Sequence, residues 1–393
     1  MGTRSIPLVV MLTLLCTTAF AHPISLSDAY VNVTETSITA KLSVLVEDLV
    51  LYQELEPNDD NFLPPDVVLE AMVPHGDFVL KHFHIMDVDG IPLEGELTKI
   101  TPPEMEAEGV HVAYLMSYNI EYELEFKLDA PPTHLTFHQD FGGDKVFLPA
   151  NMWLRLHRDE VKIEHERVLT KGIPYSVRID WSGPPQAPIM PGAVDEARLE
   201  KEADETLGIN SYGAVYSFIY ITDQEVRHEI LMPLLSMEQW VPVERKDRAF
   251  LEVDEQDAAR DAILELFKKQ NPVSIDGIRV QPVLDRLDFY GLDFTDFAVQ
   301  AERKRVSTYS ARVGIILAYP AKTPPQQVAM NWELFSSYSP VLRSLVYAYD
   351  DAATKDFYYG EDTFEWCNPG RPERPAITAV NAPPAPPKLN IPI

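Results

Sequence analysis

The sequence predicts an all-β protein made of two tandem antiparallel β-sandwiches of immunoglobulin-like type, each with a short helical insert. Three observations lead to this prediction. Short segments in which apolar and polar residues alternate recur along the chain. Proline outnumbers glycine by 33 to 17, which favours short strands joined by stiff turns. The pattern of the first half also returns in the second half, roughly 190 residues later.

The N-terminus has the pattern of an export signal over residues 1–21. Arg4 supplies the positive charge, residues 6–16 are apolar, and Ala19-Phe20-Ala21 is a small-residue cleavage site. This apolar run is too short for a stable transmembrane helix, and no later run approaches the ~18 apolar residues that one needs. We therefore expect a periplasmic or extracellular protein without a membrane span, whose mature chain begins at His22.

The first sandwich is expected over residues 22–182. Apolar residues alternate through residues 29–45 on both sides of a turn at Thr34, which predicts a pair of strands. Residues 118–128 alternate acidic with apolar side chains, as in a strand with one face in water. Residues 65–72 could form one helix. Two further strands are expected at residues 134–141 and 152–157.

The second half repeats this order. The matching segments are residues 30–35 with 218–223, residues 88–91 with 275–278, and residues 130–137 with 323–330. Three matches in the same order predict a duplicated domain, with the second sandwich over residues 214–367. Its helical insert is expected at residues 254–270, where apolar residues share one face and Pro272 ends the helix.

Two proline-rich segments flank the second sandwich. Residues 183–213 open with four prolines and continue with a charged stretch, which predicts a linker between the sandwiches. Residues 368–393 contain eight prolines and few apolar anchors, which predicts an extended tail.

The charge balance excludes some functions. With 33 basic and 61 acidic residues, the net charge of −28 makes a nucleic-acid or anionic-lipid surface very unfavourable. The sequence contains no nucleophile elbow, phosphate-binding glycine loop or zinc-protease helix. After signal removal Cys367 is the only cysteine, so no intrachain disulfide is expected. We therefore expect a protein that is not an enzyme and has no resident cofactor.

Histidine is unevenly distributed, since nine of the ten histidines lie in the first half. One interpretation is that they are partly exposed strand residues. The alternative is a copper or nickel site, in which the amine and imidazole of His22 join another histidine. The residues that could take part are His22, His82, His84, His134 and His138.

Several segments of the first half resemble a known protein family. These are the Ala-His-Pro start, residues 29–49, residues 87–93, residues 128–139 and residues 147–150. They are similar to the extracytoplasmic N-terminal domain of HupE/UreJ-type proteins, over about residues 22–165. The resemblance implies a link to nickel or cobalt handling, but the family transports metal through membrane helices that this sequence does not contain.

Together these observations favour an exported, non-enzymatic binding or accessory protein with an unidentified protein or small-ligand partner. The alternative is an exported transition-metal-binding protein that uses His22. Oligomeric state is left open by the sequence.

Overall fold

The computed structural model describes residues 26–141, 150–159, 162–183, 213–293, 296–297, 299–336, 339–349 and 351–368. We call residues 26–183 the first unit and residues 213–368 the second unit. The predicted export signal, His22, nearly all of the predicted linker and the proline-rich tail lie outside the described residues. The chain is mostly β-structure, in several sheets with few helices, as the sequence predicts.

The first unit has a six-stranded sheet with the order β10-β9-β1-β2-β7-β5. Its strands are β1 (Leu26–Val33), β2 (Ser37–Leu45), β5 (Gly95–Thr101), β7 (Asn119–Lys127), β9 (Asn151–Arg158) and β10 (Lys162–Thr170). The prediction of wholly antiparallel sheets is wrong at one pair in each unit, because β1 runs parallel to β9 and, in the second unit, Val215–Ile221 runs parallel to Val341–Ala348. The β1–β9 pairing arises because β9 and β10 form a hairpin that adds to the free side of β1.

A second, three-stranded sheet of the first unit has the order β11-β8-β4. Its strands are β4 (Phe83–Met86), β8 (His134–Gln139) and β11 (Tyr175–Arg178). Residues from both sheets, including Ala29, Leu124, Ile85 and Phe137, belong to one buried core. The two sheets therefore enclose a shared interior.

Helices lie between the strands of the first unit. They are α2 (Val46–Gln53), α3 (Pro65–His82) and the 3-10 helix η1 (Val112–Ser117), with a small ladder of β3 (Phe62–Leu63) and β6 (Val110–His111). The sequence predicted only residues 65–72 of α3. The helix continues through Pro74 because Met72, His75 and Val79 extend the buried face at helical spacing. Their burial outweighs the interior proline's cost of about 3 kcal/mol.

The second unit contains a six-stranded sheet with the order β17-β19-β13-β12-β21-β22 and a four-stranded sheet with the order β16-β15-β20-β23. The strands of the larger sheet are β12 (Val215–Ile221), β13 (Glu225–Pro233), β17 (Val283–Tyr290), β19 (Arg312–Pro320), β21 (Val341–Ala348) and β22 (Asp351–Tyr358). Those of the smaller are β15 (Val273–Ile275), β16 (Ile278–Val280), β20 (Gln327–Asn331) and β23 (Thr363–Cys367). Its other elements are α5 (Leu234–Met237), α6 (Val253–Gln270) and the ladder of β14 (Phe250–Leu251) with β18 (Val306–Ser307).

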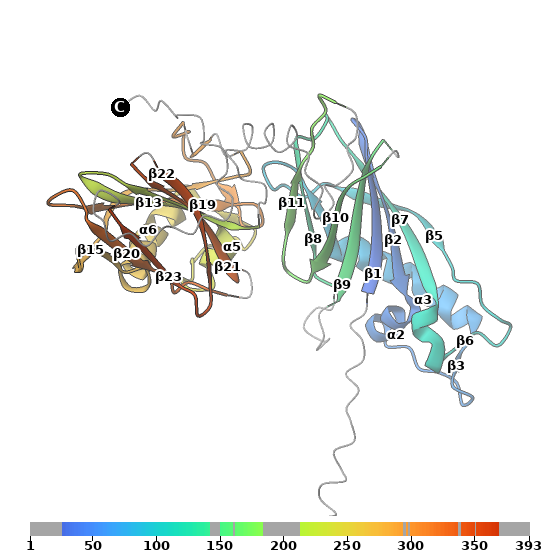
Figure 1. Cartoon of the computed structure of the whole chain (residues 1–393). Coiled ribbons are helices and arrows are strands. Elements are labelled where there is room, and N and C mark those ends of the chain that lie inside the picture. The colour runs from blue at the N-terminus through green and yellow to red at the C-terminus, as the bar shows by residue number, and fades with distance from the viewer. Residues whose placement is uncertain are drawn as a thin grey trace, which may run out of the picture.

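The two units are separate bodies of β-structure (Figure 1), and their strand orders match. In the six-stranded sheets, the order β10-β9-β1-β2-β7-β5 corresponds strand for strand to β22-β21-β12-β13-β19-β17, and the parallel pair occupies the same place in both. The offset is 188 residues for β2 and β13, for β3 and β14, and for the 18-residue helices α3 and α6. The same strand order and spacing are what a duplicated domain requires. The sequence predicted a shorter helix in the first unit than in the second, but both helices have 18 residues.

Within the described part of the chain, no helix is both long and apolar enough to span a bilayer.

Candidate functional site

Most of the predicted metal-ligating residues gather at one face of the first unit's smaller sheet. Along β8, Leu135 and Phe137 point into the core, which places His134 and His138 on the opposite face. His84 of β4 is the direct cross-strand partner of His138. His82, two residues before His84, is not on this strand, because it is the last residue of α3. We call His82, His84, His138 and Asp140 the histidine cluster.

Two histidines of the cluster approach one carboxylate, that of Asp140. Nδ1 of His82 lies 2.8 Å from Oδ1 of Asp140, and Nε2 of His84 lies 3.7 Å from the same oxygen. Burial tends to raise the pKa of Asp140, but its contacts with His84 and His82 outweigh burial and lower that pKa to about 2. Asp140 is therefore a carboxylate at every physiological pH.

His138 connects the histidine cluster to the second unit. Its ring centroid lies 4.7 Å from that of Tyr309 and 5.6 Å from that of His84. Burial lowers the pKa of His138 to about 4; His84 lowers it further and Asp140 opposes the change. Among the described residues, Nδ1 of His138 has no hydrogen-bond partner. The imidazole is neutral at pH 7 and packs as part of the junction between the units.

His134 lies on the same face but apart from the cluster. Its Nδ1 is 3.2 Å from the hydroxyl of Thr133. Burial lowers its pKa to about 4, Arg178 lowers it further, and Asp293 of the second unit opposes this. His134 therefore also lies near the junction, without joining the other histidines.

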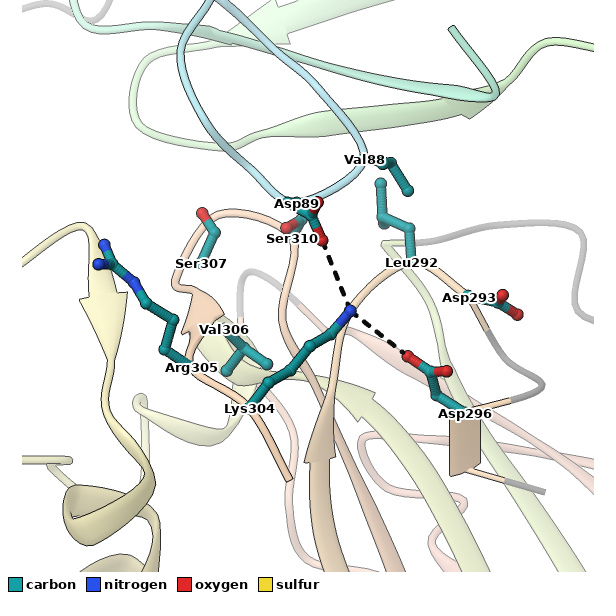
Figure 2. A pocket seen from close by; sticks show the side chains of 11 residues that line it. Val88, Asp89, Leu292, Asp293, Asp296, Lys304, Arg305, Val306, Ser307 and Ser310 are labelled. Carbon is teal, nitrogen blue, oxygen red and sulfur yellow. Dashed lines mark hydrogen bonds and ion pairs between the residues drawn. The ribbon is translucent and has the colours of Figure 1, made fainter. Parts of the chain in front are cut away.

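The junction itself is a close contact between two loops, shown in Figure 2. Gly90, with a φ of +74°, lies so close to the second unit that an added Cβ would be 2.1 Å from Cβ of Ser307. Lys304 of the second unit points between two acids, with Nζ 3.5 Å from Oδ1 of Asp89 and 3.9 Å from Oδ2 of Asp296. Shape and charge thus both hold the first unit's loop against the second unit.

As arranged here, the histidines do not form a metal centre. Over the described residues, no group of three or more His, Cys, Asp or Glu side chains is placed so that it could hold a metal ion. His22, the central residue of the metal prediction, lies outside those residues. The sequence missed Asp140 and Tyr309. The available signal for Asp140 was the His-x-His spacing of residues 82–84 together with the His-x-Asp spacing of residues 138–140.

A second polar group lies in the core of the second unit. His228 of β13 is fully buried, with Nε2 2.7 Å from Oγ of Ser217 and Nδ1 3.0 Å from Nδ2 of Asn271. The Asn271 amide also donates to the Tyr319 hydroxyl at 3.3 Å. Because this amide donates to Nδ1, the proton of His228 is on Nε2 and is donated to Ser217. A general base for a serine nucleophile must instead accept the hydroxyl proton, so this pair is not arranged for nucleophilic catalysis.

This network is absent from the first unit. Strand register and the C-caps of α3 and α6 identify the equivalent positions in the two units. The first unit has Ala29 in place of Ser217, Ala40 in place of His228, Phe83 in place of Asn271 and Phe126 in place of Tyr319. Both sets are buried, so the two cores differ in polarity at the same place in the fold.

Comparisons with known proteins identify no family. No family model matches the chain, and no curated protein matches it. A solved chain described as the complete structure of manganese lipoxygenase of Gaeumannomyces graminis and partial structure of zonadhesin of Komagataella pastoris is similar over 88% of this chain and 97% of its own length. The sequence identity is 8% and the TM-score is 0.15, so this similarity carries no argument about fold or function.

Proposed function

We propose that the protein is an exported, non-enzymatic binding or accessory protein built from two immunoglobulin-like sandwiches over residues 22–182 and 214–367. The observation that carries this proposal is the junction between the units. Tyr309 of the second unit packs on His138 of the first unit, and Gly90 of the first unit lies against Ser307 of the second. The histidines, which are the residues most suited to catalysis or metal binding, thus take part in joining the two units. This leaves the outer surfaces for binding.

Strand order supports the immunoglobulin-like assignment. In immunoglobulin constant domains the sheets follow the chain order 1-2-5-4 and 3-6-7. The first unit has the neighbours β1-β2-β7-β5 in one sheet and β4-β8-β11 in the other, which is that order once the β9–β10 hairpin and the small β3–β6 ladder are set aside. The second unit repeats it with β12-β13-β19-β17 and β15-β20-β23. Sandwiches of this kind serve many unrelated functions, so binding must be tested directly.

Export is supported by the N-terminal signal pattern and by the resemblance to extracytoplasmic HupE/UreJ-type domains. The test is affinity capture of exported proteins from the source cells by the full mature chain, followed by size-exclusion chromatography. We expect one partner in a stoichiometric complex. Recovery of nothing above an unrelated acidic β-sandwich control, or turnover of a substrate by the purified chain, would contradict the proposal.

A transition-metal-binding role is the second candidate. It is favoured by the approach of His82 and His84 to the same oxygen of Asp140. These distances of 2.8 and 3.7 Å are direct contacts between the side chains, so binding of a metal ion would require the histidine cluster to rearrange. The test is elemental analysis of untagged mature protein, followed by copper and nickel titrations. Stoichiometric binding that Asp140→Asn and an added N-terminal residue both weaken would favour this role, and absence of binding would remove it.

A further inference from the structure

Exposed apolar side chains gather on the helices of the first unit. Leu69 and Val73 on α3 are 46% and 60% exposed, and Tyr114 on η1 is 61% exposed. Leu51 on α2 and Met116 on η1 are also exposed. Since α2 contacts both α3 and η1, the three elements lie side by side (Figure 1), and we call them together the helical cap.

The second unit provides an internal comparison. At the offset of 188 residues that relates α3 to α6, the residues equivalent to Leu69 and Val73 are Asp257 and Asp261, and both are exposed. The fold therefore does not require apolar residues at these two positions. On α3 they lie four residues apart and so form one stripe on the helix surface. An apolar stripe that the equivalent helix lacks is typical of a contact surface.

The surroundings of this stripe are strongly acidic. Asp66, Glu70 and Asp77 are exposed on α3 around Leu69 and Val73. Over α2, α3, η1 and the loops that join them to the ladder (residues 46–82 and 102–117), the chain has twelve acidic residues and one lysine. The cap thus combines an apolar centre with a negative rim, which is the arrangement of a protein interface.

We propose that the helical cap is the docking surface for an amphipathic, basic segment of a partner protein, whose apolar side faces Leu69 and Val73 and whose Lys and Arg side chains meet the acidic rim. This deepens the proposed binding function and rests on it. A second copy of the chain would bring two negative rims together, which opposes association. An anionic membrane would be repelled in the same way, so charge complementarity selects a basic protein.

The test uses the full chain and a synthetic 18-residue amphipathic helix of leucine and lysine as the probe. A peptide of the same composition in scrambled order has the same charge but no apolar face. We expect fluorescence anisotropy to give a Kd at least tenfold lower for the amphipathic peptide. The variant Leu69→Asp/Val73→Asp copies the acids of α6 and should bind both peptides equally.

Two further variants make this test specific. Ile278→Asp/Val299→Asp adds the same two charges at exposed sites in the second unit and should keep the tenfold preference. Tyr114→Ser/Met116→Ser alters the cap without added charge and should reduce the preference. This second cap variant also keeps the test decisive if circular dichroism shows that the aspartate variant does not fold.

Several outcomes would overturn the proposal. They are an unchanged peptide preference in folded cap variants, self-association of the wild type that Leu69→Asp/Val73→Asp abolishes, and binding to phosphatidylcholine vesicles that the same variant abolishes. If affinity capture finds a partner that still binds this variant, the proposed binding function stands and the helical cap is not its site.

Discussion

The buried network around His228 makes the second unit sensitive to acid. Burial lowers the pKa of His228 from 6.5 to about 3. The unfolded chain therefore binds a proton at His228 more readily than the folded chain does. The stability that depends on neutral His228 is fully present above pH 6.5 and is lost as the pH falls toward 3. From these two values, protonation of His228 alone removes about 3 kcal/mol of unfolding free energy between pH 8 and pH 4, and about 5 kcal/mol below pH 3.

The perturbation that tests this is the exchange of the whole network for the residues of the first unit. The variant Ser217→Ala/His228→Ala/Asn271→Phe/Tyr319→Phe leaves no buried titratable base at this site. Pulse proteolysis in urea, with fragments of each unit resolved by mass, reports the stability of the second unit separately. We expect the wild type to lose about 3 kcal/mol between pH 8 and pH 4, and the variant to lose much less.

The single variant His228→Ala would be less informative, because it leaves the Ser217 hydroxyl and one N–H of the Asn271 amide without their partner in the core, at a cost of about 1–3 kcal/mol for each group. The reasoning would be refuted if the second unit of the wild type had the same urea midpoint at both pH values. It would also be refuted if the fourfold variant, folded at pH 8, kept the full acid sensitivity.

Two further predictions concern the junction between the units and the six-stranded sheet of the first unit. Gly90→Val should separate the units, since an added Cβ would meet Ser307, and small-angle scattering should then give a larger radius of gyration. Gly277→Val is the control, because Gly277 has a similar φ but an added Cβ there would meet no atom within 4 Å. An unchanged radius would show that the junction does not hold the units. Arg155→Ala should destabilise the first unit in urea by about 1–2 kcal/mol, since its guanidinium packs on two aromatic rings and binds two acids. The exposed Lys41→Ala should cost less than about 1 kcal/mol, and equal losses would contradict this ranking.

Much of the fold could be predicted from local pattern. Strands such as β7 have acids on one face and core residues on the other, so alternation alone locates them. Helix α6 follows from its apolar periodicity and from Pro272 after its end. The second half of α3 was missed because Pro74 suggests a helix end, and only tertiary packing of residues beyond it shows otherwise. The parallel β1–β9 pair joins residues that are 125 positions apart in the chain, which no local signal encodes.

The candidate site was predictable in part. The His-x-His spacing placed His82 and His84 close together, although on different elements. The role of Tyr309 depends on how the two units pack, and nothing within either unit's sequence indicates that contact. The network of His228 required knowledge of strand register, because its members are far apart in the chain.

Two units of equal topology in one chain face a hazard during folding, since a strand of one could insert into the other. The different cores oppose this exchange. If β2 replaced β13, Ala40 would stand where His228 is needed, and the Ser217 hydroxyl and one N–H of the Asn271 amide would lose their partner in the core. If β13 replaced β2, its imidazole would enter an apolar interior. The polar network therefore disfavours pairing between strands of different units, which leaves fewer competing arrangements while both units are unfolded.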